Sequence, residues 1–152
     1  MCVPVLVTMD TKEHYLFLSS QDSLAYFPNN RAHRFTIKLP GILKLSGTWK
    51  CALVEMTYFP QFSGERPKQI YLCSDLVQES YGSNSMLPIL RRIPVPTALN
   101  TKTTLTFPQN YYFPVSREEI QYVHIYLKDQ KLQNPSFVVE SLTCTLHLVR
   151  VH

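Results

Sequence analysis

The sequence predicts an all-β chain that folds as one β-sandwich, with about eight strands in two sheets. Three observations indicate this class. Alternation of apolar and polar residues recurs along the chain, whereas no long segment has the 3.6-residue period of a helix. Eleven prolines and only four glycines, among nine tyrosines and eight phenylalanines, are typical of short extended segments separated by rigid turns. A length of 152 residues suits a single domain, 1–152, in which we expect residues 1–12 to form a short flexible arm.

Three segments show the alternation most clearly: HRFTIKLP at 33–40, QYVHIYLK at 121–128 and SLTCTLHLVRV at 141–151. Each should bury one face and expose the other. We expect the first strand to stop at Pro40-Gly41. In the second, Tyr122, His124 and Tyr126 should point away from the core.

A fourth segment, WKCALVEMTYF at 49–59, is apolar at nearly both parities. Such a run predicts a central strand covered on both faces. Glu55 lies inside it, and a buried carboxylate there needs an arginine or backbone donors as partners. The other expected elements are strands at 14–20, 69–76, 86–93 and 103–107, a short extended piece near 111–115, and one helical turn at 116–119, where Ser116 and Glu119 have the spacing of a capping box.

Residues that carry chemistry are sparse. The net charge is +4, and the charges are scattered, as on a solvated surface. No CxxC motif occurs, and Cys51, Cys73 and Cys144 lie in apolar runs, which predicts buried thiols. The five histidines form no metal-binding spacing, although His124 and His147 would face one another if their strands were neighbours. There is no nucleophile elbow and no glycine-rich phosphate loop, so we expect no enzyme and no cofactor.

The absence of a stretch of about 20 apolar residues predicts no membrane span, and residues 1–10 do not have the pattern of a signal peptide. Strand faces rich in tyrosine suit protein interfaces, because the ring is apolar and its tip is polar. This favours a binding or structural protein. Two alternatives stay open: a non-catalytic ligand-binding β-sandwich, and an accessory β-barrel that stacks single-stranded nucleic acid on its aromatic rings.

The stretch YFPNNRAHRFTIKLPGILKLSGTWKCALVEMTYFP at 26–60 resembles the N-terminal signature of penton proteins from Polinton/Maverick elements and the related adinto-like and adomavirus-like group of double-stranded DNA viruses. The segments 70–95 and 107–150 are similar to later parts of that family, in the same order. Lys50 and Cys51 depart from it, because acidic and small apolar residues are usual there. The matching positions are Tyr26, Pro28, Asn30, Phe35, Thr36, Lys38, Leu39, Pro40, Leu45, Gly47, Trp49, Leu53, Glu55, Tyr58 and Pro60.

The resemblance implies a minor capsid protein with one jelly-roll domain that forms homopentamers at icosahedral vertices. Its expected partners are further copies of itself, the major double jelly-roll capsid protein and a fibre or other vertex protein, with no specific nucleic acid. The expected location is the virion capsid, assembled inside the host cell, in the nucleus. For subunit contacts we select Phe27, Asn29, Phe62, Tyr122 and Tyr126.

Overall fold

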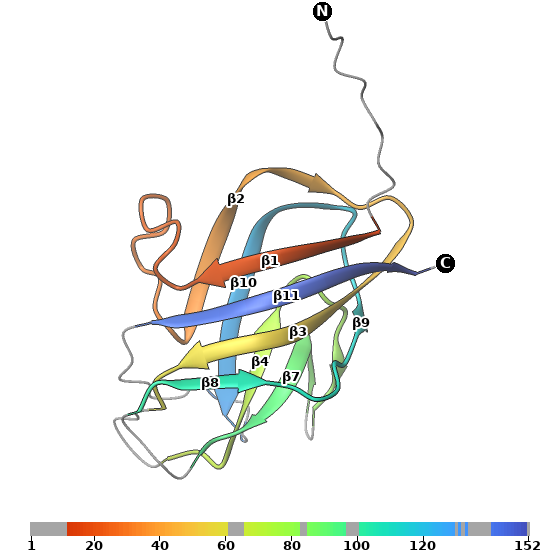
Figure 1. Ribbon diagram of the computed structural model, residues 1–152. Coiled ribbons are helices and arrows are strands. Elements are labelled where there is room, and N and C mark those ends of the chain that lie inside the picture. The colour runs from red at the N-terminus through yellow and green to blue at the C-terminus, as the bar shows by residue number, and fades with distance from the viewer. Residues whose placement is uncertain are drawn as a thin grey trace, which may run out of the picture.

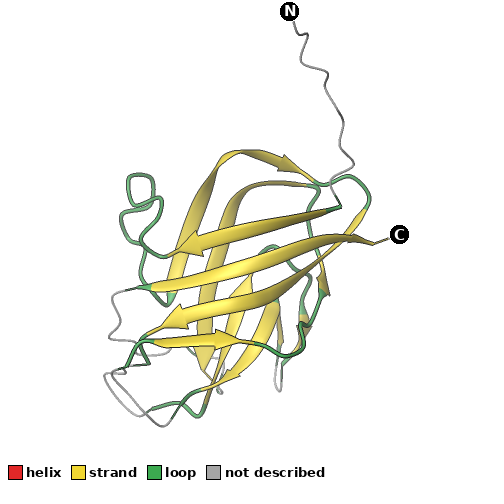
Figure 2. Cartoon of the chain, viewed as in Figure 1, coloured by secondary structure: helices red, strands yellow, loops and turns green. Residues whose placement is uncertain are grey.

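A computed structural model describes residues 12–60, 66–82, 85–96, 101–129, 131, 133 and 141–151. These residues are strands and loops, with no helix among them (Figure 2). The strands, in chain order, are β1 (Glu13–Ser19), β2 (Arg34–Lys44), β3 (Thr48–Tyr58), β4 (Gln69–Ser74), β5 (Ser80–Tyr81), β6 (Met86–Leu87), β7 (Ile89–Pro94), β8 (Thr103–Thr106), β9 (Phe113–Pro114), β10 (Glu119–Asp129) and β11 (Leu142–Val151).

Two antiparallel sheets hold most of these strands (Figure 1). The first has the order β1-β11-β3-β8, with β9 also paired to β3. The second has the order β2-β10-β4-β7, and β5 and β6 form a separate two-stranded hairpin. The all-β class is thereby confirmed. The strand count is above the predicted eight because two short strands form the hairpin and β9 is a short addition to the first sheet.

The core lies between the two sheets and draws on both of them. Phe35 and Ile37 of β2, together with Val123, Ile125 and Leu127 of β10, are buried from the second sheet. The first sheet contributes alternate residues of β11 from Leu142 to Leu148. The period-2 patterns at 33–40, 121–128 and 141–151 therefore predicted the buried faces correctly.

Strand β3 is central, between β11 and β8, but the prediction that both faces are covered is wrong at Glu55, whose side chain is exposed. Thr145 of β11 pairs with Glu55 and Leu146 pairs with Leu53, so Val54 is an extra residue in the ladder. This bulge shifts the alternation by one residue. The core residues are Trp49, Cys51 and Leu53 before the bulge and Met56 and Tyr58 after it. Before the bulge, Ala52 is also fully buried, so both faces of β3 are covered there.

Strand β2 continues through Pro40-Gly41 to Lys44, contrary to the predicted stop. It lies at the edge of its sheet, where a proline costs no ladder hydrogen bond on the open side. The ladder to β10 is nevertheless interrupted there, because Lys38 pairs with Tyr122 and Leu43 pairs with Ile120. The proline and glycine thus mark an irregularity in pairing, and the strand itself bends past it (Figure 1).

The predicted helical turn at 116–119 is also wrong: Ser116 and Arg117 lie in a loop, and β10 already begins at Glu119. Ser116 Oγ donates a hydrogen bond to the carbonyl oxygen of Asp75, 2.8 Å away, and so serves a contact between loops. Within the described part of the chain, there is no helix of the length and apolar character that a membrane crossing needs. The predicted arm, apart from residue 12, and the candidate contact Phe62 lie outside the described residues.

Candidate interaction surface

The loop between β1 and β2 covers the open edge of β2. The side chain of Asn30 acts there as a neighbouring strand would, because its Oδ1 accepts the N–H of Thr36 at 3.0 Å and its Nδ2 donates to the carbonyl oxygen of Thr36 at 2.8 Å. Asn30 Nδ2 also donates to the carbonyl oxygen of Asp22 at 3.3 Å, and Ser23 Oγ accepts the N–H of Lys38 at 2.9 Å. Exposed strand edges attract other strands, and these bonds close part of this edge.

The same loop places aromatic rings beside β10. Phe27 packs edge-to-face on Tyr122, with ring centroids 6.0 Å apart. Lys38, the partner of Tyr122 in the β2–β10 ladder, holds its Nζ 4.2 Å from the ring centroid of Tyr26. Tyr26 is 62% exposed and Tyr122 is 43% exposed. We call Tyr26, Phe27, Lys38 and Tyr122 the Tyr122 patch.

Two of the sequence-predicted contacts, Phe27 and Tyr122, are thus in direct contact. Asn29 is exposed on the same loop. Tyr126 is half-buried further along β10, with its ring centroid 5.2 Å from that of His124. Burial raises the pKa of the Tyr126 hydroxyl to about 12, with smaller contributions from neighbouring acidic groups.

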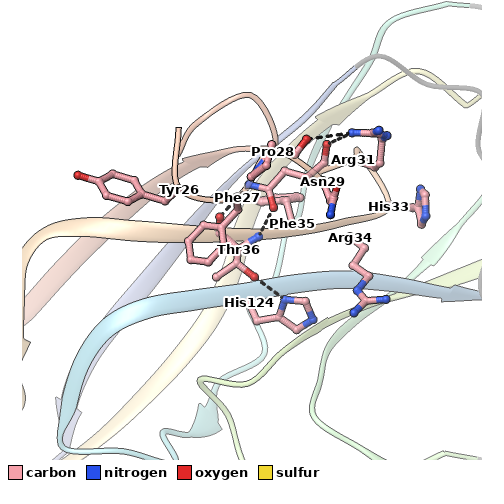
Figure 3. A pocket seen from close by; sticks show the side chains of 11 residues that line it. Tyr26, Phe27, Pro28, Asn29, Arg31, His33, Arg34, Phe35, Thr36 and His124 are labelled. Atoms are coloured by element: carbon pink, nitrogen blue, oxygen red, sulfur yellow. Dashed lines mark hydrogen bonds between the residues drawn. The ribbon is translucent and has the colours of Figure 1, made fainter. Parts of the chain in front are cut away.

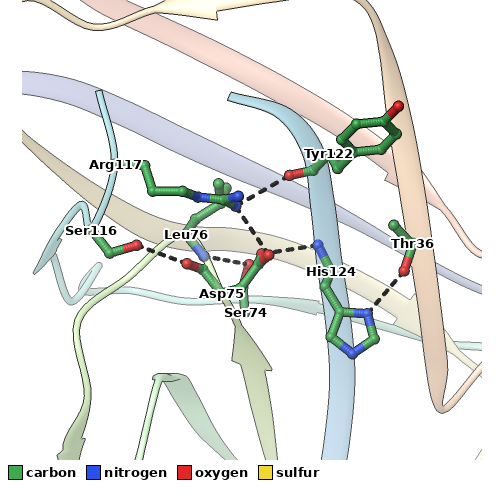
Figure 4. Close-up of polar contacts among 8 residues, drawn as sticks. All are labelled: Thr36, Ser74, Asp75, Leu76, Ser116, Arg117, Tyr122 and His124. Carbon is green, nitrogen blue, oxygen red and sulfur yellow. Dashed lines mark hydrogen bonds and ion pairs between the residues drawn. The ribbon is translucent and has the colours of Figure 1, made fainter. Parts of the chain in front are cut away.

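A polar network centred on Asp75 holds β10 in position below the patch (Figure 4). Its Oδ1 accepts the backbone N–H of His124 at 3.0 Å, and its Oδ2 pairs with Arg117 Nη2 at 3.0 Å. Arg117 Nη2 also donates to the carbonyl oxygen of Tyr122 at 3.2 Å. Because both members of the ion pair are partly exposed, the pair itself adds little stability. Its effect is to tie two loops to the strand that carries Tyr122.

The turn before β3 depends on Gly47, whose φ is +91°. A Cβ at this position would lie 3.0 Å from Arg150 Nε, at the end of a flexible side chain, so the positive φ is the main reason for glycine here. Next to it, Trp49 is buried, donates its indole N–H to the carbonyl oxygen of Ser46 at 2.8 Å and stacks on His14 at 5.4 Å between ring centroids. These two signature residues therefore have structural roles.

The other signature positions divide between the core and the surface. Phe35, Leu45, Leu53 and Tyr58 belong to the core, and Pro60 is also buried. Thr36, Lys38 and Leu39 are half-buried, whereas Pro28, Pro40 and Glu55 are exposed. Because Glu55 is exposed, water can solvate its carboxylate, and the buried partner that the sequence predicted is not needed.

The three predicted buried thiols, Cys51, Cys73 and Cys144, are free and buried. Burial raises the pKa of each to about 12, so at neutral pH they are thiols with little nucleophilic thiolate. Among the described residues, no group of three or more histidine, cysteine, aspartate or glutamate side chains is arranged to hold a metal ion.

His124 and His147 do not face one another, because β10 and β11 belong to different sheets. His147 instead joins a cluster on the outer face of the first sheet. Its Nε2 lies 2.8 Å from Glu13 Oε2, its Nδ1 lies 2.9 Å from Tyr112 Oη, and its ring stacks on Tyr15 at 4.5 Å. Glu13 and Tyr15 are two residues apart in β1, so both side chains lie on the same face of the sheet. The long-range pairing to β11 had no signal in the sequence.

The comparisons with known proteins assign no family to the chain: neither the protein-family models nor the curated proteins include a match. Functional interpretation therefore depends on the strand order, the exposed aromatic residues and the resemblance in residues 26–60.

Proposed function

We propose that the chain is a single jelly-roll capsid protein, the penton of a double-stranded DNA virus related to the Polinton/Maverick, adinto-like and adomavirus-like group. In this proposal it is a structural protein without enzymatic activity. Five copies form a ring at each icosahedral vertex of the virion, beside a double jelly-roll major capsid protein and a fibre or other vertex protein. Assembly takes place inside the host cell, in the nucleus.

The strand order is the observation that carries the proposal. A jelly roll has eight strands in two sheets, built from two Greek keys, and viral capsid domains are among its main users. In this chain β1, β3, β8 and β11 lie in one sheet and β2, β4, β7 and β10 in the other. The chain therefore crosses repeatedly between the sheets, and its first and last long strands, β1 and β11, pair with each other. This order supports a jelly roll over a meander of sequential hairpins.

The Tyr122 patch is the surface that we propose for subunit contact. Tyrosine is enriched at interfaces because it buries a large ring while its hydroxyl can still bond. The patch comes from the loop after β1, from β2 and from β10, and the hydrogen bonds of Asn30 and the Asp75 network fix these elements in advance. A surface ordered before association loses less conformational entropy on binding. A closed ring of five also limits growth, unlike an open head-to-tail chain.

The test is the mass of the purified protein by light scattering after size exclusion, over a concentration series at low and high salt. The proposal predicts a species near five times 17.6 kDa that persists on dilution. A stable interface of this kind should bury more than roughly 1,000 Å². A monomer at every concentration and salt would contradict the proposal.

A further inference from the structure

Two arginines without an ion-pair partner among the described residues line a cleft beside the β1–β2 loop. The cleft has a volume of about 530 Å³ and is formed by residues 26–31 and 33–36 with His124 of β10 (Figure 3). Arg31, His33 and Arg34 are among its lining residues, and none of the lining residues is acidic.

A tight backbone turn fixes the two arginines next to each other. Arg31 and Arg34 form an antiparallel bridge in which each backbone N–H donates to the other's carbonyl oxygen, at 2.9 and 3.1 Å. Like charges opposite one another in such a bridge are unfavourable. Neither guanidinium has an ion-pair partner within the described ranges of the chain. An anion bound in the cleft would offset these two uncompensated charges.

The charges of the two arginines act on His33. Burial lowers the pKa of His33, and the charges of Arg34 and Arg31 lower it further. Burial also lowers the pKa of His124; the charge of Asp75, the next largest effect, raises it, and the charge of Arg34 lowers it by less. Asp75 is not among the lining residues of the cleft, and its carboxylate accepts the N–H of His124 and pairs with Arg117.

The walls of the cleft are ordered. Arg31 Nη1 donates to the carbonyl oxygen of Asn30 at 2.8 Å, and Thr36 Oγ1 lies 3.0 Å from His124 Nδ1. Figure 3 shows Arg31, His33 and Arg34 along one side, with the ring of His124 near the Arg34 guanidinium. Phe27 and Tyr26 add aromatic carbon at the other side.

We propose that this cleft binds the phosphate group of a ligand about the size of a nucleotide. Two guanidinium groups supply two positive charges and the forked donors that fit phosphate, which carries a charge of about −1.5 to −2 at pH 7. A single carboxylate would leave one arginine uncompensated. The volume is in the range of small-ligand sites, roughly 300–1,000 Å³, and leaves space beside the phosphate for a ring to contact the aromatic residues. This inference does not rest on the proposed assembly.

The test is isothermal titration calorimetry on the full chain at matched ionic strength, with adenosine 5′-monophosphate, adenosine, inorganic phosphate and a short single-stranded oligonucleotide as probes. The variant is Arg34→Gln, which removes one charge from the cleft. Its control is Lys102→Gln, which removes one charge at an exposed position just before β8.

We expect the monophosphate to bind more tightly than inorganic phosphate, and adenosine to give no measurable heat. Arg34→Gln should weaken binding of the monophosphate about tenfold or more, because a charge-assisted hydrogen bond is lost, whereas Lys102→Gln should leave that binding unchanged. If the oligonucleotide binds and its binding depends on Arg34, the phosphate that the cleft recognises belongs to a nucleic-acid backbone. If the monophosphate binds and the oligonucleotide does not, the ligand is a free nucleotide. Equal weakening by both variants, equal binding of adenosine, or no binding of any phosphate probe would overturn the site.

Discussion

Asn30 offers the sharpest single-residue test of how the β1–β2 loop is held. Replacement by alanine removes three hydrogen bonds, at 2.8, 3.0 and 3.3 Å, and leaves the N–H and carbonyl of Thr36 at the β2 edge without them. At about 1 kcal/mol for each bond, with the longest weaker than the others, we expect Asn30→Ala to lower the free energy of unfolding by about 2–3 kcal/mol. For an m value of about 2 kcal/mol/M, the urea midpoint falls by about 1–1.5 M.

The assay is urea unfolding followed by far-UV circular dichroism at one protein concentration, because any oligomer makes the midpoint depend on concentration. Asn29→Ala is the matched control, since Asn29 is exposed on the same loop. We expect this control to stay within about 0.5 kcal/mol of the unsubstituted protein. A loss for Asn30→Ala no larger than that of the control would refute the argument that Asn30 closes the β2 edge.

Three further predictions follow from the turn, the thiols and the patch. Gly47→Ala should destabilise by about 1–2 kcal/mol in a thermal melt, because a φ of +91° is strained for a residue with a Cβ. The control Gly41→Ala meets nothing within 4 Å and should change little, so equal losses would count against the turn argument. The free energy of unfolding should fall as pH rises from about 9 to about 12, because the buried thiols stay protonated in the folded state after those of the unfolded chain have ionised. Cys51→Ala should make this fall with pH less steep in urea melts at several pH values. A pH dependence that Cys51→Ala leaves unchanged would contradict the burial effect. Tyr122→Ser should shift the mass measured by light scattering toward that of the monomer. Tyr81→Ser, at an 87% exposed position in β5, should leave this mass unchanged. If the two variants behave alike, the Tyr122 patch is not the subunit contact.

Much of the fold could be read from local patterns. The alternation around Phe35, Val123 and Cys144 predicted which face of each strand is buried, because a strand with one covered face requires that period. The errors arose where a local pattern has two readings. The run around Val54 looked doubly buried, since a bulge and a two-faced strand both place apolar residues at successive positions. Pro40 looked like a stop because the sequence does not show which strands lie at an edge.

The candidate surfaces were predictable only in part. Phe27 and Tyr122 were selected separately, one as a turn residue and one as an outward tyrosine, and their contact depends on β2 pairing with β10, 88 residues apart at Thr36 and His124. The charged cleft was missed because Arg31 and Arg34 look like scattered surface charge in the sequence. A backbone bridge between residues 31 and 34 brings the two arginines to one turn, and the side chain of Asn30 holds the loop in place. The Ser116 capping pattern was misread because its hydroxyl bonds to Asp75, which is distant in sequence.

The central claim is a closed ring of five jelly-roll subunits, and its most direct test is electron microscopy of the purified protein with rotational averaging imposed only after classification. If the chain forms this ring, particles at concentrations where light scattering gives a stable mass should be ring-shaped, and their class averages should have five-fold symmetry. Particles the size of one 17.6 kDa chain, or rings with another symmetry, would contradict it.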